Sequence, residues 1–243
     1  MTHLLMTWTT GGMERIPIPY SLRMDDGITL ILLCCFFLSA YILSHNRKLL
    51  LQLMKNFLLH RERASIFTTS TSADMRYLLL LILQACVLAG ICFFSYFKDV
   101  TPGLIQHVPP GILLGAYTVI CLLYLFLKWM VYSFLGWIFL DKSTLSFWID
   151  SYSTLLYYLG FILFPLALFI VYFDLNILQT VVIGLFLVVS TKIMMLYKWL
   201  KLFCHNLRGC LFLILYFCAL EIMPCLVLYQ GMMRLNDFLI IKF

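Results

Sequence analysis

The side chain of this sequence whose type and position are most suited to chemistry is a carboxylate inside an apolar run. Glu221 lies about half-way along the run 209–229, and Pro224 follows three residues later. A charged carboxylate at the centre of a membrane helix costs at least about 2.5 kcal/mol, so we expect Glu221 to be neutral, paired or facing a wet cavity. Pro224 has no backbone N–H and leaves the carbonyl of Leu220 without its helical partner. An acid beside such a broken turn is common in transporters and relays.

Lys192 is the candidate partner of Glu221. Counted from the same expected end of their helices, Lys192 lies about 9 Å deep and Glu221 about 18 Å deep. A lysine stem can bridge much of that gap, or its ammonium can snorkel to the interface instead. Gln84 is a further polar candidate, for which interhelical hydrogen bonding is the usual role. Carboxylates inside a membrane are functional by default, but no second acid joins Glu221, so we favour a structural role for it over a functional one.

The sequence contains no pattern that is typical of an enzyme or of a cofactor site. The five histidines are scattered, and the nine cysteines include no CxxC pair. A zinc site or a disulfide framework needs clustered ligands, so we interpret the cysteines as small packing residues. GxSxG, HExxH and phosphate-binding glycine loops are absent from the sequence. We therefore expect no catalytic, cofactor-binding or metal-binding residues and no cofactor, and we favour a protein that is not an enzyme.

The elements that hold these residues must be helices in a membrane. The chain has 243 residues, of which 63% are hydrophobic and only 12% are charged. Soluble domains carry about 25% charged residues. A water-soluble fold of this length cannot bury so much apolar surface, so the lipid bilayer is the expected partner of the chain. Barrel strands are excluded because the apolar runs are too long and show no period of two.

Six apolar runs are long enough to cross the hydrocarbon core, which needs roughly 20 helical residues. They predict an all-α, polytopic membrane helix bundle over residues 28–229, preceded by an extracytoplasmic segment 1–27 and followed by a short extracytoplasmic tail 230–243. The expected spans are, approximately, 28–44, 77–97, 111–127, 154–173, 177–197 and 209–229. A chain of this length leaves no room for an added soluble domain of normal size.

The third apolar run has two interpretations. As one helix, residues 111–140 would extend about 45 Å, well beyond the hydrocarbon core. Lys128 stands where a span of ordinary length would reach the far interface. We favour a span over 111–127 followed by an interfacial helix over 129–140, with Trp129 and Tyr132 among its interfacial aromatic residues. The alternative is one long, tilted helix.

Loop charges predict the orientation. With six spans, the strongly basic connections 45–76 and 198–208 fall on one face. The positive-inside rule makes that face cytoplasmic, so both termini are expected outside, in the periplasm. The acidic pair Asp25 and Asp26 before the first span fits an N-terminus left outside and does not fit a cleavable signal peptide.

The predicted cytoplasmic loop 45–76 carries an amphipathic helix over 48–63. Its basic residues are candidate contacts for lipid or for a protein partner: Arg47, Lys48, Lys55, Arg61 and Arg63. Anionic lipid attracts each basic residue by about 1 kcal/mol, and we weigh this above docking of a cytoplasmic protein. No nucleic-acid partner is expected, because the basic residues match the topology rule and form no recognition module.

Four segments carry a resemblance to a known family. They are LSHNRK at 43–48, GWIF at 136–139, FLILY at 212–216 and, as the most specific, LEIMP at 220–224. With these segments the chain resembles a family of Bacteroidota membrane proteins catalogued as domain of unknown function 4271, over most of its length from the first span onward. The resemblance implies a multi-pass protein of the inner membrane of a diderm bacterium. It implies no activity.

Two functional hypotheses follow. The first, which we favour from the sequence, is a non-enzymatic subunit or scaffold of an envelope complex that docks through the loop 45–76. The second is a small transporter or proton-coupled permease that uses Glu221 beside the Pro224 kink. A water-filled cavity reaching Glu221 would favour transport, whereas a dry, enclosed carboxylate would favour the scaffold. No inverted repeat between the two halves is evident, which counts against a transporter.

Overall fold

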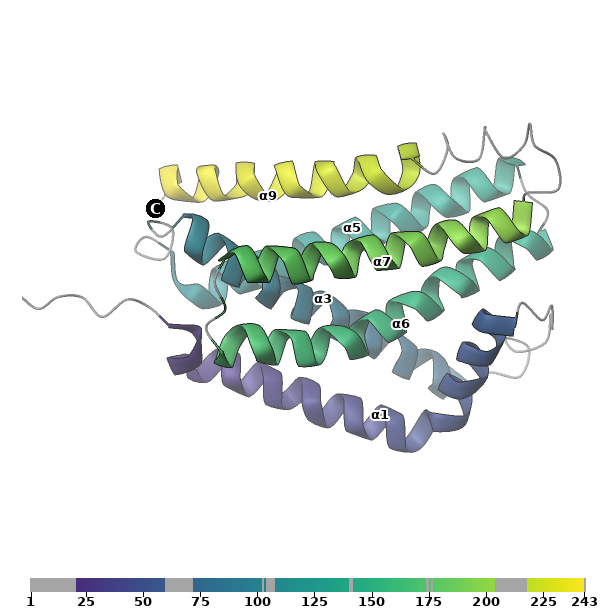
Figure 1. The fold of residues 1–243 in the computed structure, drawn as a ribbon, viewed down its shortest axis with the longest axis horizontal. Helices are drawn as coiled ribbons and strands as arrows, with labels where there is room; N and C mark the ends of the chain where they lie inside the picture. Colours follow the sequence, from purple (N-terminus) through teal and green to yellow (C-terminus); the bar gives the residue numbers. More distant parts are fainter. Residues whose placement is uncertain are drawn as a thin grey trace, which may run out of the picture.

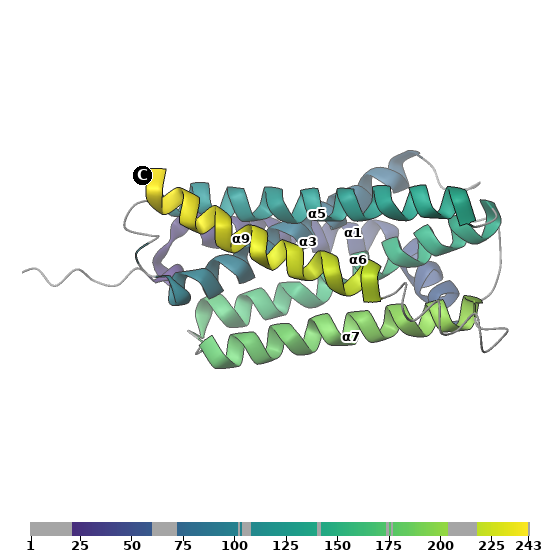
Figure 2. The ribbon, with the colours of Figure 1, turned by 90° about the horizontal axis from the view of Figure 1, so that it is seen from above.

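The computed structural model describes residues 21–59, 72–101, 103, 108–139, 142–173, 175, 177–203 and 218–242. All elements in these ranges are helical: η1 (Leu22–Met24), α1 (Asp26–Leu59), α3 (Ser72–Val100), α5 (Pro110–Phe139), α6 (Lys142–Tyr172), α7 (Ile177–Phe203), η2 (Cys218–Ile222) and α9 (Met223–Lys242). The prediction of an all-α bundle is confirmed. The long helices run side by side along one axis, and successive helices from α1 to α7 point in opposite directions (Figures 1 and 2).

Five helices of the described part are long and apolar enough to cross a membrane. These candidate spans are Asp26–Lys55, Arg76–Val100, Pro110–Phe134, Trp148–Tyr172 and Ile177–Lys198. Large apolar side chains also cover the outside of the bundle, as at Leu178 and Phe186 of α7, which are 74% and 72% exposed. Such a surface is stable in lipid and not in water. The chain is therefore a multi-pass membrane protein.

The sixth expected span, 209–229, begins among residues outside the described ranges and stays a prediction. Its second half is helical, and the helix continues beyond it. Residues 230–242, expected as a tail, form the rest of α9, in which Met232 and Asn236 are buried against the main core. Tyr117 of α5 donates a hydrogen bond of 2.6 Å to Asn236 Oδ1. The prediction of a tail was wrong here, because average polarity hid the buried face of this helix.

Helix α3 is the central element, packed mainly between α5 and α6. Its buried side chains, among them Leu88, Ile91 and Phe94, form the main core with residues of α1, α5, α6 and α9. Two glycines allow close approach. A Cβ at Gly90 would lie 2.7 Å from Thr118 Oγ1 of α5, and one at Gly160 of α6 would lie 3.4 Å from the backbone oxygen of Leu81 in α3. Small residues commonly let membrane helices pack this closely.

Helix α1 continues past the first expected span. It bends at Asn46, whose φ of −115° and ψ of 24° are not helical, and then runs on to Leu59. Leu50 and Leu53 of the second half are buried against α3 and α6. The hydroxyl of Tyr158 in α6 donates a hydrogen bond of 2.7 Å to the carbonyl of Leu50. The part of the amphipathic helix that the structure describes is therefore docked on the bundle.

Helix α5 is continuous from Pro110 to Phe139. The preferred division into a span and a separate interfacial helix was wrong, and the alternative of one long helix is what the structure contains. Trp129 is 48% exposed, whereas Tyr132 is buried. The physical reason lies at Lys128, which is also buried and faces other helices, so it does not mark a point where the helix must leave the hydrocarbon.

The start of α1 and the end of α9 lie at the same end of the bundle, together with the ends of α3 and α6 (Figures 1 and 2). The opposite end, here called the basic end, carries the second half of α1 with Arg47, Lys48 and Lys55. These three side chains are exposed, whereas Arg61 and Arg63 lie outside the described residues.

Candidate functional site

Glu221 is buried inside the bundle on an irregular turn. Its side chain is 1% exposed. It belongs to η2, a single π-helical turn, and Pro224 is the second residue of the α-helix that follows. Proline cannot donate the hydrogen bond that would continue a regular helix, so the wider turn lies where the sequence predicts the break. Turns of this type are frequent at functional sites.

Two lysines converge on this carboxylate. Lys128 Nζ of α5 donates to Glu221 Oε2 at 2.5 Å, and Lys192 Nζ of α7 donates to the same oxygen. The other oxygen, Oε1, accepts a hydrogen bond from the hydroxyl of Tyr132. The side chains of Lys128 and Lys192 are 6% and 22% exposed. We call these four residues the ion cluster; it joins α5, α7 and η2 at one point.

Helical spacing explains why α5 contributes two members of the ion cluster. Lys128 and Tyr132 are four residues apart and therefore lie on one face of the helix. Three tyrosine rings surround the Lys128 ammonium, with centroids 5.1 Å away for Tyr152, 5.5 Å for Tyr132 and 5.9 Å for Tyr124. Aromatic faces attract a cation most strongly when it is shielded from water. The tyrosines thus offset part of the cost of burying this lysine.

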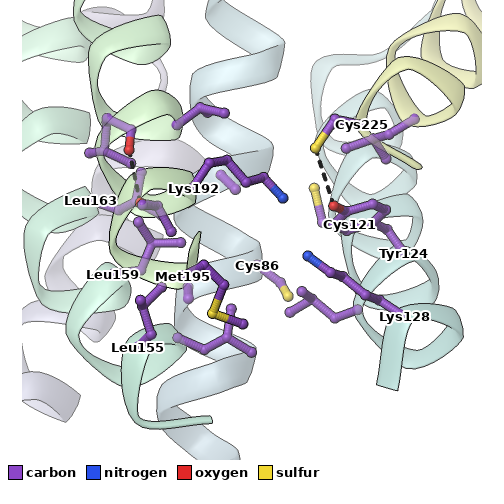
Figure 3. A pocket seen from close by; sticks show the side chains of 18 of the residues that line it. Cys86, Cys121, Tyr124, Lys128, Leu155, Leu159, Leu163, Lys192, Met195 and Cys225 are labelled. Atoms are coloured by element: carbon purple, nitrogen blue, oxygen red, sulfur yellow. Dashed lines mark hydrogen bonds between the residues drawn. The ribbon is translucent and has the colours of Figure 1, made fainter. Parts of the chain in front are cut away.

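Three members of the ion cluster, Lys128, Lys192 and Glu221, line a pocket of about 200 Å³. Figure 3 shows Lys192 on one wall and Lys128 on the other, with both ammonium groups directed into the space between them. Beside Lys128, the hydroxyl of Tyr124 and the thiol of Cys225 lie 3.3 Å apart. A cavity therefore reaches Glu221, and its access to water is the property that separates the two functional hypotheses.

The remaining walls of the pocket are apolar and come from several helices. Among the lining side chains are Phe93 of α3, Leu159 and Leu163 of α6, and Leu187 of α7. Along α7 the lining residues lie on both sides of Lys192, from Leu187 to Met195. The pocket is thus amphipathic, with the charged groups of Lys128, Lys192 and Glu221 set among largely apolar walls.

The charged groups of the pocket are paired with one another. Within the described ranges, no group of three or more histidine, cysteine, aspartate or glutamate side chains is arranged to hold a metal ion. Glu221, the one carboxylate among the described lining residues, is occupied by two ammonium groups and a phenol. With both lysines protonated and Glu221 ionised, the ion cluster carries one net positive charge.

The other predicted candidates lie apart from the ion cluster. Gln84 of α3 is buried and donates a hydrogen bond of 2.6 Å to Ser39 Oγ of α1, which is the interhelical role expected for it. Gln84 does not line the pocket. Arg47, Lys48 and Lys55 lie on the far side of the kink in α1 and take no part in the pocket.

Sequence reasoning missed Lys128 and Tyr132 as members of the ion cluster. Both were interpreted as markers of the membrane interface. Charge balance offered a signal: Lys128 interrupts an apolar helix of 30 residues, and a buried lysine needs a carboxylate. Glu221 is the acid inside a predicted span, so Lys128 and Lys192 were both candidate partners for it.

Comparison with family models gives one match, to a domain of unknown function (DUF4271), over residues 28–232. Neither the curated proteins nor the solved structures yield a match. The matched segment includes the ion cluster and the turn that carries Glu221. Since the match covers most of the 243 residues, the chain belongs to the DUF4271 family.

Proposed function

We propose that this protein is a small-molecule carrier of the membrane, with the pocket as its substrate site and Lys128, Lys192 and Glu221 as the charged groups of that site. The observation that supports this most directly is the cavity of about 200 Å³ that reaches Glu221. From the sequence we favoured a scaffold, because the expected spans contain few polar residues and the loop 45–76 is basic and amphipathic. Because the structure contains this pocket, we now favour the transporter hypothesis over the scaffold.

The energetics of the ion cluster support a role beyond stability. Removing charges from water is expensive, and replacing a buried ion pair by apolar residues of similar volume is often neutral or stabilising. Glu221 and Lys128 are almost fully buried, so a purely structural bundle would be served as well by leucine and methionine. A site that must bind and release a charged group has a reason to keep them.

The connections between the helices also suit a moving part. Helix α7 packs on α3 and α6, whereas α9 packs on α5, and α7 makes few backbone contacts with η2 or α9. The ion pair of Lys192 with Glu221 therefore joins two walls of the pocket that are otherwise separately anchored. Exchange of that pair for a pair with substrate would let α7 move against η2, as gating of one helix group against another requires.

Cysteine accessibility tests this proposal. In a background that keeps only Cys225, a membrane-impermeant maleimide should label this pocket-lining thiol in lipid vesicles. A matched background that keeps only Cys35, which is buried in the main core away from the pocket, should stay unlabelled. Labelling of Cys225 should change in rate when Glu221→Gln breaks the link to Lys192. Labelling of neither thiol, in a protein of normal thermal stability, would show that the pocket is closed to water and refute a carrier.

A second candidate function is the subunit or scaffold of an envelope complex. It is favoured by the exposed basic residues Arg47, Lys48 and Lys55, which project from the second half of α1. Purification in mild detergent should then recover a stoichiometric partner, and the triple substitution of these residues by glutamine should release it. A protein that stays solitary, with the same phenotype after that substitution, would count against docking.

We further propose that the membrane is the bacterial inner membrane and that the basic end faces the cytoplasm. The basic residues of the second half of α1 support this orientation through the positive-inside rule. A cysteine introduced by Lys48→Cys in a cysteine-free background should react with impermeant maleimide in inverted vesicles and not in intact spheroplasts. Labelling in intact spheroplasts and not in inverted vesicles would show that the basic end faces away from the cytoplasm.

A further inference from the structure

The charges that line the pocket do not balance. The lining side chains that are charged at neutral pH are Lys128 on α5, Lys192 on α7 and Glu221 on η2, and the other titratable groups facing them among the described residues are tyrosines and cysteines. Two ammonium groups share one carboxylate oxygen. An unbalanced charge in a low-dielectric interior is costly, and one added negative charge would neutralise the site.

Lys192 is the lysine available to a ligand. Its side chain is 22% exposed, against 6% for Lys128, and Figure 3 shows its ammonium directed into the pocket. An ammonium carries three N–H donors, and one of those of Lys192 is used by Glu221. Lys128 is held by Glu221 and surrounded by three tyrosine rings. An entering anion therefore meets Lys192 first.

Size and wall chemistry restrict the anion further. A protein cavity of about 150 Å³ lined by aliphatic and aromatic side chains accommodates benzene. The pocket of about 200 Å³ therefore has room for a ring or short chain together with an acid group. Its leucine and phenylalanine walls offer nothing to a strongly hydrated inorganic ion, and a dianion would reverse the imbalance instead of removing it.

We propose that the pocket binds a small organic monoanion of about the size of benzoate, with its acid group on Lys192 and its apolar body against the leucine-lined walls. This inference deepens the proposed function, because it names the ligand class of the same site. The acid group competes with Glu221 for the Lys192 ammonium. Ligand binding thereby loosens the link between α7 and η2 without leaving either lysine unpaired.

Calorimetric titration of the full chain in lipid nanodiscs tests this, with three probes of one shape and different charge. Benzoate should bind, whereas benzyl alcohol and benzylammonium should bind at least about tenfold more weakly. Lys192→Met should weaken benzoate by about 10- to 100-fold, the range for losing one charge-assisted hydrogen bond. The matched control Lys48→Met removes an exposed lysine outside the pocket and should leave benzoate affinity unchanged. Decanoate is the fourth probe. Tighter binding of decanoate than of benzoate would show that the ligand is a membrane-derived acid, and weaker binding would show that it is a water-soluble one.

Three results would overturn the inference: no heat with benzoate, equal binding of benzyl alcohol, or full benzoate affinity in Lys192→Met. The comparison of probes on the unchanged protein stands even if the variant folds poorly, and Lys192→Arg, which keeps the charge, should retain binding. The carrier proposal fails separately. If benzoate binds as expected but Cys225 labels identically with and without it, the site recognises the anion and does not move.

Discussion

Replacing Glu221 by leucine should destabilise the protein severely, and replacing the two lysines as well should reverse the loss. Glu221→Leu leaves the ammonium groups of Lys128 and Lys192 buried without their shared carboxylate. Leaving a buried charge uncompensated costs about 3–5 kcal/mol. The triple variant, which adds Lys128→Met and Lys192→Met, removes all three charges and should be neutral or up to about 4 kcal/mol more stable than the natural chain.

Thermal unfolding in detergent, read by the fraction that stays monodisperse after heating, provides the assay. For chains of this length 1 kcal/mol corresponds to about 2–4 °C, so Glu221→Leu should lower Tm by about 6–20 °C. Asp237→Asn is the matched control, because Asp237 is an exposed acid on α9, and it should change stability by no more than about 0.5 kcal/mol.

The decisive comparison is between the single and the triple variant. An unchanged Tm for Glu221→Leu would show that the carboxylate does not compensate the lysines. A triple variant no more stable than the single one would show that the loss comes from packing around the η2 turn and not from charge. Either result would refute the reasoning about the ion cluster.

Three further predictions concern single contacts, and thermal unfolding in the same detergent checks each of them. Gly90→Ala should lower the free energy of unfolding by about 1–3 kcal/mol, because its Cβ would lie 2.7 Å from Thr118 Oγ1. Adding Thr118→Ala should recover part of this stability. Full stability of Gly90→Ala would show that α3 and α5 are not in close contact there. Tyr117→Phe should lower the free energy of unfolding by about 1–3 kcal/mol, because it leaves Asn236 Oδ1 unpaired. Adding Asn236→Leu should restore most of this stability. If the two substitutions instead lower the stability additively, the two side chains are not paired. Tyr132→Phe should cost about 1.5–3 kcal/mol through its bond to the ionised carboxylate, and no loss would place Tyr132 outside the ion cluster.

The helical bundle was predictable because lipid imposes a simple rule. A stretch such as 177–197 has to be a helix in hydrocarbon, since its backbone groups find no other partners. Pro224 likewise predicted the irregular turn beside Glu221, because a residue without an N–H cannot continue a regular helix in any surroundings. These inferences depend on local chemistry, which the sequence contains.

The contacts across helices were less accessible. Lys192 could be paired with Glu221 by depth, but the choice between pairing and snorkelling depends on which face of α7 meets the bundle. Lys128 stands at a depth that fits an interface as well as a buried pair, and only the rotation of α5 about its axis distinguishes the two. The rotation of a helix about its axis cannot be predicted from an apolar run that is hydrophobic on all sides.

The ends of the helices were missed for a related reason. Hydropathy falls after residue 44 and again after residue 229, so both points were interpreted as helix ends. Leu50 and Met232 nevertheless pack into cores beyond these points. Average polarity reports where a helix leaves lipid, whereas packing of one face against a neighbouring helix decides where it stops.

The proposed site depends on direct contact between Glu221 and two lysine ammonium groups inside the folded protein in lipid. Solid-state NMR can measure this by dipolar dephasing between lysine ¹⁵Nζ and glutamate ¹³Cδ in bilayers, because the chain has three glutamates, Glu14, Glu62 and Glu221. We expect dephasing that corresponds to an N–C separation of about 3.5 Å, reduced by Lys128→Met or Lys192→Met and abolished by Glu221→Gln. The absence of short-range dephasing, or a signal that persists in Glu221→Gln, would contradict it.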